Sequence, residues 1–165
     1  MAEYRFVTVW RIPAAIERVW KALNTADQYG DWWPNVVDFR DLTPGVSGVG
    51  ARVERVIRGR LPYRLRYAVT ITRSEPLREL AYDSTGDLTG DGRFVLEEKD
   101  GNIDVTFHWN VRTSHWWMNA FAFILRPLLS WNHHQVMAEG ERGLIEWLKD
   151  PSHADVSETK LSQQQ

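Results

Sequence analysis

The first thirty residues combine a strand pattern with helical spacing. Large side chains occupy every second position between residues 4 and 12, which places one set on a single face of a strand: Tyr4, Phe6, Thr8, Trp10 and Ile12. Pro13 ends this strand, and the apolar positions that follow recur at helical spacing: Ile16, Val19, Trp20 and Leu23. A second short helix is predicted over Thr25–Trp32, capped by Asn24 or Thr25 and ended by Pro34.

Short alternating segments fill the chain from Val36 to Ser114. The clearest predicted strands are Arg52–Arg58, Tyr63–Ser74, Glu79–Ser84, Arg93–Glu98 and Ile103–Thr113. The segments between them are rich in turn-forming residues, namely TPGVSGVG, GRLP, SEP, STGDLTGDG and EKDGN. Asp100-Gly101 is a favourable hairpin turn. This spacing is typical of an antiparallel meander.

Helical character returns after Ser114 and continues to about Leu148. Because Pro127 cannot donate to the preceding turn, we expect a kink or a restart near Arg126. At helical spacing the inward stripe of this segment consists of Phe121, Leu125, Leu129, Val136, Gly140, Leu144 and Trp147. The tail over residues 150–165 is polar and without periodicity, so we expect it to be disordered.

The order of the predicted elements indicates the fold class. One strand, two short helices, about six further strands and one long apolar helix predict an α+β fold. A twisted antiparallel sheet of this kind should curl around the remaining helix, giving a single domain over residues 1–149.

Composition limits the classes of function. With a net charge of −2 and charges of both signs interspersed, the chain shows no electrostatic footprint for nucleic acid. It has no cysteine, which excludes disulfides and thiolate chemistry. The start MAEYRFVTVW lacks the features of a signal peptide, so we expect a cytoplasmic protein. Nine tryptophans either fill a core or line a cavity.

Several segments resemble a known superfamily. IPAAIERVWKALNTADQYGDWWPNV resembles the opening of the START-like "polyketide cyclase/dehydrase and lipid transport" superfamily (SRPBCC), and GRLPYRL, TGDLTGDGRF, RPLLSWNHH and MAEGERGL resemble one bacterial branch of it. The resemblance runs from about Tyr4 to Leu148. It implies a helix-grip fold around a deep hydrophobic cavity, in proteins that bind or transport lipids, sterols and hormones or that cyclise polyketide-like substrates. No catalytic residue of the aromatase/cyclases matches a position here, so none is carried over.

One strand places a charge on the inner face of the sheet. In ARVERVIRG the less charged face carries Val53, Arg55 and Ile57, so Arg55 is expected to point inward. A buried guanidinium needs a partner. The functional interpretation is an anchor for a ligand carboxylate or enolate. The alternative is an arginine that reaches out at a cavity mouth or pairs with a nearby acid.

Two polar residues interrupt the apolar stripe of the long helix. Asn132 and His133 lie about 50° to either side of the stripe's centre, whereas His134 points away from it. His133 is a candidate general acid or base, a donor to a ligand oxygen, or a structural group. The two histidines diverge too far to share a metal ion, and no metal-ligand spacing or cofactor motif is present.

These observations lead to three hypotheses. The first is a monomeric or homodimeric protein that binds a hydrophobic, aromatic or lipid-like small molecule. The expected ligand-binding residues are Arg55, Tyr67, Tyr82, Phe94, Trp109, Leu129, Asn132 and His133. The second is a cyclase/dehydratase-type enzyme in which Arg55 stabilises an enolate and His133, titrating near neutral pH, shuttles a proton. The third is an interaction module whose cavity is filled by its own aromatic side chains.

The segment WWMNAFAFILRPLL has two interpretations. It is too short and too interrupted to span a bilayer, so no stable membrane insertion is expected. It is either a lid whose Trp116 and Trp117 touch a membrane surface or a helix start that packs against the sheet.

Overall fold

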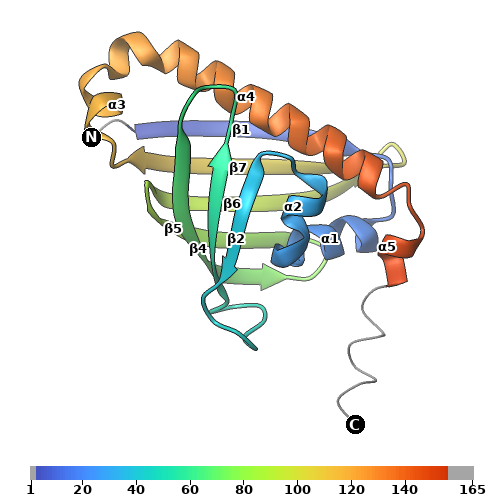
Figure 1. Ribbon diagram of the computed structural model, residues 1–165. Helices are drawn as coiled ribbons and strands as arrows, with labels where there is room; N and C mark the ends of the chain where they lie inside the picture. Colours follow the sequence, from blue (N-terminus) through green and yellow to red (C-terminus); the bar gives the residue numbers. More distant parts are fainter. Residues whose placement is uncertain (1–2, 156–165) are drawn as a thin grey trace.

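A single curved sheet wraps around one long helix in the computed structural model, which describes residues 3–155 (Figure 1). The strands are β1 (Glu3–Ile12), β2 (Val36–Asp41), β3 (Arg52–Arg58), β4 (Arg64–Glu75), β5 (Glu79–Gly86), β6 (Leu88–Lys99) and β7 (Asn102–Thr113). The helices are α1 (Ile16–Asn24), a 3-10 turn (Ala26–Gln28), α2 (Tyr29–Trp32), α3 (Trp116–Ala120), α4 (Ala122–Trp147) and α5 (Ser152–Asp155). The predicted helix-grip fold is confirmed.

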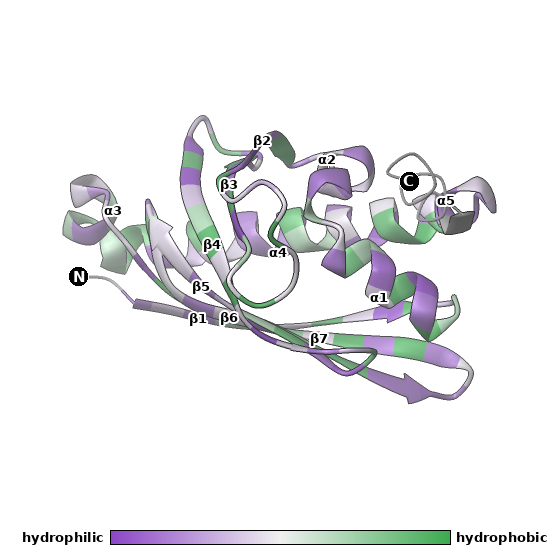
Figure 2. Ribbon diagram, turned by 90° about the horizontal axis from the view of Figure 1, so that it is seen from below, coloured by the Kyte–Doolittle hydropathy of each residue, from purple (hydrophilic) through white to green (hydrophobic). Residues whose placement is uncertain are grey.

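The sheet is antiparallel throughout, in the order β1-β7-β6-β5-β4-β3-β2. Side-chain alternation directs one face toward α4, as predicted for β7, where the inward set is fully buried: Ile103, Val105, Phe107, Trp109 and Val111. The outer face carries polar residues interspersed with exposed valines, and the helices lie on the inner side (Figure 2). The concave inner face therefore supplies most of the core.

Residues with turn-forming or glycine-specific conformations explain one predicted strand boundary that is confirmed and one that is wrong. The predicted hairpin at Asp100-Gly101 is present, with φ of 52° and 75° at the two residues. STGDLTGDG, expected to be a break, instead lies mostly within β6, which starts at Leu88. Gly90 makes this possible, because a Cβ at that position would lie 2.0 Å from the carbonyl oxygen of Asn110 on β7.

The helix ends differ in detail from the prediction. Neither Asn24 nor Thr25 caps the segment after α1 through its side chain; the Thr25 hydroxyl instead donates to the Lys21 carbonyl at 2.7 Å and closes the last turn of α1. The predicted second helix is split into a 3-10 turn and the four-residue α2.

The long helix breaks earlier than expected. α3 ends at Ala120, and Phe121, with φ and ψ of −107° and 18°, separates it from α4. α4 then runs through Pro127 without restarting at Arg126. Because Pro127 has no backbone N–H, one helical hydrogen bond to the Phe123 carbonyl is missing. That carbonyl lies on the exposed side of the helix, where water can bind it instead. Because of the break, Phe121 is 52% exposed and is not part of the inward stripe. Among the helices of residues 3–155, none is both long and apolar enough to cross a membrane.

The end of α4 also departs from the prediction. Trp147, expected to point fully inward, is half-buried and stacks on His153 of α5 with 4.2 Å between ring centroids. The tail expected to be disordered from residue 150 thus begins with the short helix α5. The rest of that predicted tail, residues 156–165, lies outside the described residues.

Candidate functional site

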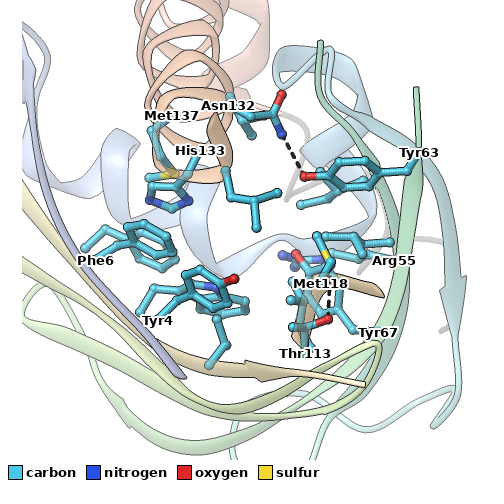
Figure 3. Close-up of a pocket in the computed structure, with 18 of the residues that line it drawn as sticks. Tyr4, Phe6, Arg55, Tyr63, Tyr67, Thr113, Met118, Asn132, His133 and Met137 are labelled. Atoms are coloured by element: carbon cyan, nitrogen blue, oxygen red, sulfur yellow. Dashed lines mark hydrogen bonds between the residues drawn. The ribbon is translucent and has the colours of Figure 1, made fainter. Parts of the chain in front are cut away.

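A cavity of about 110 Å³ lies between α4 and the inner face of the sheet (Figure 3). The eight residues predicted to bind a ligand all line it: Arg55, Tyr67, Tyr82, Phe94, Trp109, Leu129, Asn132 and His133. Their role as ligand contacts stays a prediction. The third hypothesis required a core filled by aromatic side chains, and the space beside Trp109 speaks against it.

Aromatic rings form the floor of the cavity and continue into the core. Trp109 lies 5.5 Å from Tyr82, 5.7 Å from Tyr67 and 5.6 Å from Phe107, measured between ring centroids. The network extends through Phe94 to Trp10, which packs edge-on against Trp32 and Trp33. Such contacts fix the rings in place, so the floor is a preformed apolar surface.

Arg55 is buried in the sheet without an acidic partner. Its side chain is 9% exposed, and its guanidinium carbon lies 3.9 Å from the centroid of the Tyr29 ring. No carboxylate within residues 3–155 lies in ion-pair distance of Arg55, and its buried Nε has no hydrogen-bond partner there. The acid pairing that one expected alternative required is therefore not found among the described residues, and the guanidinium lies against the Tyr29 ring instead.

Three tyrosines surround this cation and stay protonated. Burial raises the pKa of Tyr67 to about 12 and that of Tyr82 well above its usual value. The charge of Arg55 lowers both pKa values, but burial is the larger effect. The pKa of Tyr29 is raised in the same way, and its hydroxyl donates to the Leu23 carbonyl at 2.5 Å. The positive charge of Arg55 is therefore surrounded by neutral tyrosine side chains.

His133 faces the cavity from α4 and stacks on Phe6, with ring centroids 3.8 Å apart (Figure 3). Its buried Nε2 has no hydrogen-bond partner among the described residues. Burial lowers the pKa of His133 to about 3, with a smaller contribution from the charge of His134. This lowered pKa disfavours the proton transfer near neutral pH that the enzyme hypothesis requires of His133. At neutral pH it is an uncharged imidazole.

His134 occupies the opposite side of the helix, as predicted. It is exposed, and its Nδ1 lies 2.7 Å from the carbonyl oxygen of Ser130 on the previous turn. Within the described part of the chain, no three histidine, aspartate or glutamate side chains are grouped so that they could hold a metal ion.

Asn132 uses its amide to hold the β3–β4 connection against α4. Its Oδ1 accepts a hydrogen bond from the Arg60 backbone N–H at 2.8 Å, and its Nδ2 donates to the Tyr63 hydroxyl at 3.2 Å. Gly59 permits this approach, because a Cβ there would lie 2.4 Å from Oδ1. Asn132 therefore positions one wall of the cavity.

Replacing Asn132 by alanine is expected to lower the free energy of unfolding by about 2 kcal/mol, because a part-buried N–H and a hydroxyl lose their partner. Urea unfolding measures the change. The matched control is Asn110→Ala, which removes one exposed hydrogen bond to Asp91 and should change stability by less than about 0.5 kcal/mol. Equal effects of the two substitutions would mean that Asn132 does not hold this connection.

Sequence reasoning missed six lining residues: Trp33, Tyr63, Leu88, Thr113, Met118 and Met137. Tyr63 lies four residues before Tyr67 in the predicted strand Tyr63–Ser74, so alternation could have placed it inward. Met118 lies on the short α3, where no periodicity indicates which way a side chain points. Tyr4 was placed on one face of the first strand without a ligand-binding role; it lines the cavity, and its buried hydroxyl has no hydrogen-bond partner in residues 3–155. The Tyr4 hydroxyl, the Arg55 Nε and the His133 Nε2 are thus three buried polar atoms of cavity-lining residues without a hydrogen-bond partner among residues 3–155.

A second hollow, of about 300 Å³, meets the first at Arg55 and Tyr82. Its base is buried and apolar, including Val53 and Val69, and its rim is exposed and polar, including Asp27 and Ser47. Arg55 is thus flanked by space on two sides.

The curved antiparallel sheet around one long helix, with a cavity between them, is the helix-grip architecture. No family model matches the chain, and no curated protein matches it in sequence. Among solved structures, it is similar to protein TTHA0849 from Thermus thermophilus, at 16% identity and a TM-score of 0.68, over 88% of this chain and 98% of that one.

Two further similar structures are described as aromatase/cyclases. The Zhui aromatase/cyclase from Streptomyces sp. R1128 has 13% identity and a TM-score of 0.68, over 90% of this chain and 94% of that one. The di-domain ARO/CYC StfQ of the steffimycin biosynthetic pathway has 14% identity and a TM-score of 0.60, over 90% of this chain and 52% of that one. At these identities the likeness shows the fold alone.

Proposed function

We propose that this protein binds a hydrophobic, ring-containing small molecule in the cavity under α4, as a cytoplasmic monomer or homodimer. The observation that carries the proposal is the buried Arg55, which lacks a carboxylate partner in the described chain and lies at the wall of an apolar, aromatic cavity. A buried charge is costly unless it is paired, so a ligand carboxylate, enolate or carbonyl oxygen is the natural complement.

The size of the cavity restricts the ligand. A dry cavity of about 150 Å³ accepts benzene, so the 110 Å³ present here holds at most a single small ring unless its walls adjust. A larger ligand requires displacement of the lining side chains. Met118 and Met137 are the most adaptable of these, because the unbranched methionine side chain repacks readily.

The pKa values of His133 and Tyr67 favour ligand binding over proton-transfer catalysis. The cyclase/dehydratase alternative asks His133 to exchange a proton near neutral pH, whereas burial lowers its pKa to about 3. The high pKa of Tyr67, about 12, makes it a hydrogen-bond donor at neutral pH and a poor acid. These groups orient a ligand better than they move protons.

The test has two parts. Native mass spectrometry of protein purified gently from its own host should show a small-molecule adduct that is lost on unfolding, and extraction then identifies its chemistry. In parallel, NMR titration measures the binding of two single-ring probes. Benzoate carries a carboxylate, and benzyl alcohol does not.

Replacing Arg55 by methionine is expected to weaken benzoate binding at least about tenfold, because a charge-assisted hydrogen bond is lost, and to leave benzyl alcohol nearly unaffected. The control is Arg58→Met, an exposed arginine on the same strand, which should change neither. Benzoate binding that survives in Arg55→Met would contradict the anchoring role. Absence of binding by either probe, together with a clean apo mass, would count against the cavity as a ligand site.

A further inference from the structure

The start of the long helix exposes an apolar surface that the ligand cavity does not use. We call it the α3–α4 face and define it by its six exposed apolar residues, Trp116, Phe121, Phe123, Ile124, Leu128 and Trp131. Phe123 is 96% exposed, Trp116 74% and Ile124 70%. Large contiguous apolar surfaces of this kind are uncommon on soluble monomers and mark interaction sites.

The orientation of these side chains follows from the helix itself. Leu125 and Leu129 point toward the sheet, and at 100° per residue Phe123, Ile124 and Trp131 fall on the opposite side. Beyond Trp131 the outward side of α4 becomes polar, with His134 and Arg142 exposed. The exposed apolar side is thus confined to α3 and the first turns of α4, at the end of the molecule where β1 begins (Figure 1).

Cations border this face, and its own segment has no carboxylate. Between Asp104 and Glu139 the sequence has no aspartate or glutamate. Arg126 is exposed on α4, and Arg5 and Arg112 are exposed on the neighbouring strands β1 and β7. A groove of about 420 Å³ between β1 and α4 is lined by Arg5, Arg126 and Ser130, with Glu3 as its one acid, paired with Arg5 at 3.5 Å.

We propose that the α3–α4 face docks on a bilayer of anionic phospholipid. The apolar side chains enter the interface between headgroups and acyl chains, and Arg126 with Arg5 contacts lipid phosphates from the adjacent groove. A second copy of the chain fits less well. A two-fold contact sets the same surface against itself, so Arg126 would approach its own copy without a carboxylate from this segment to pair with it.

The position of α3 links this surface to the cavity. Trp116 projects into solvent from α3, whereas Met118, two residues later, is buried and lines the cavity. Trp117 lies between them, half-buried against the Tyr63 ring at 5.7 Å. Docking would therefore place the α3 side of the cavity next to the lipid. Trp117 thus packs on the fold, whereas the interpretation in which Trp116 touches a membrane surface stays a prediction that the present proposal extends.

Co-sedimentation with large vesicles tests the proposal. The full chain is mixed with vesicles of pure phosphatidylcholine or of phosphatidylcholine with phosphatidylglycerol. We expect binding to the anionic vesicles that weakens as salt is added. Phe123→Gln/Ile124→Gln should lower the partition coefficient at least about tenfold. Val7→Gln/Val9→Gln, which alters two exposed valines on the outer face of β1, away from the α3–α4 face, should leave it unchanged.

A charge variant separates the electrostatic contribution to vesicle binding from the apolar one. Arg126→Gln should lower partition into the anionic vesicles roughly fivefold, while Arg142→Gln, an exposed arginine farther along α4, should have little effect. The proposal is overturned if wild type does not bind anionic vesicles or if the Phe123/Ile124 variant binds like wild type. It is also overturned if light scattering shows that wild type is a dimer, that the Phe123/Ile124 variant is a monomer, and that wild type does not bind vesicles. The face is then a contact between two copies of the chain.

Discussion

Replacing Gly143 by alanine is expected to destabilise the fold by about 3 kcal/mol. A Cβ at this position would lie 1.7 Å from the backbone carbonyl oxygen of Trp32, so either α2 or α4 has to move. The improved helix propensity of alanine, about 1 kcal/mol, offsets only part of that cost. Chemical denaturation followed by far-UV circular dichroism measures the change.

Gly30 provides the matched control. It also lies in a helix, α2, but a Cβ there meets nothing closer than the Val36 carbonyl oxygen at 3.6 Å. Gly30→Ala should therefore be neutral or stabilising by up to about 1 kcal/mol. If Gly143→Ala proves as stable as Gly30→Ala, then α4 does not pack on the Trp32 backbone as closely as described.

Replacing His133 by phenylalanine is expected to remove an acid sensitivity of the fold. The pKa of His133 is about 3 in the folded protein and near 6.5 when the chain is unfolded. Between these values the unfolded state binds more protons, so stability falls as the pH falls from about 6.5 to about 3. Above that window His133 is neutral in both states and contributes no pH dependence.

The size of the effect follows from the same linkage. On going from about pH 7.5 to about pH 4.5, the variant should gain roughly 2–3 kcal/mol relative to wild type. Phenylalanine keeps the stack on Phe6 and needs no hydrogen-bond partner at the position of Nε2. Urea unfolding at the two pH values gives the difference.

His134 is the control for this experiment. It is exposed on the same helix, so His134→Gln should leave the pH dependence largely intact. Parallel pH profiles for wild type and His133→Phe would mean that His133 is hydrated and free to protonate in the folded protein.

The pattern of the strands was sufficient to predict the inner face of the sheet. Alternation in β7 and β3 correctly placed Trp109 and Arg55 toward α4, because a side chain in a strand has only two faces to choose from. The surroundings of Arg55 were not predictable. Its cation–π partner Tyr29 comes from α2, and no local pattern relates that helix to β3.

The helical predictions failed where a single backbone conformation decided the outcome. Pro127 was expected to interrupt the helix, yet the interruption lies at Phe121, whose sequence neighbours carry no turn signal. Periodicity likewise placed His133 near the stripe but could not give its pKa, which depends on burial beneath surrounding elements. The structural partners of Asn132 were not predictable for a similar reason, because the backbone N–H groups that hydrogen-bond to it belong to a distant loop.

The attachment of α4 has a mechanical consequence. Toward its C-terminal end the helix is anchored laterally: Trp33 donates to the Val136 carbonyl at 3.0 Å, Asn35 to Glu139 at 2.8 Å, and the Arg11 backbone to Glu141 at 3.0 Å. Gly140 lies directly beneath the Trp33 indole, so an axial slip of one turn would drive a bulkier residue into that ring. The helix is therefore held most firmly near Trp33 and less firmly at its N-terminal end, where Arg126 donates an exposed hydrogen bond to the Glu3 carbonyl at 3.2 Å. The cavity can widen if the N-terminal end of α4 bends away from the sheet together with α3, but not if α4 slides along its own axis.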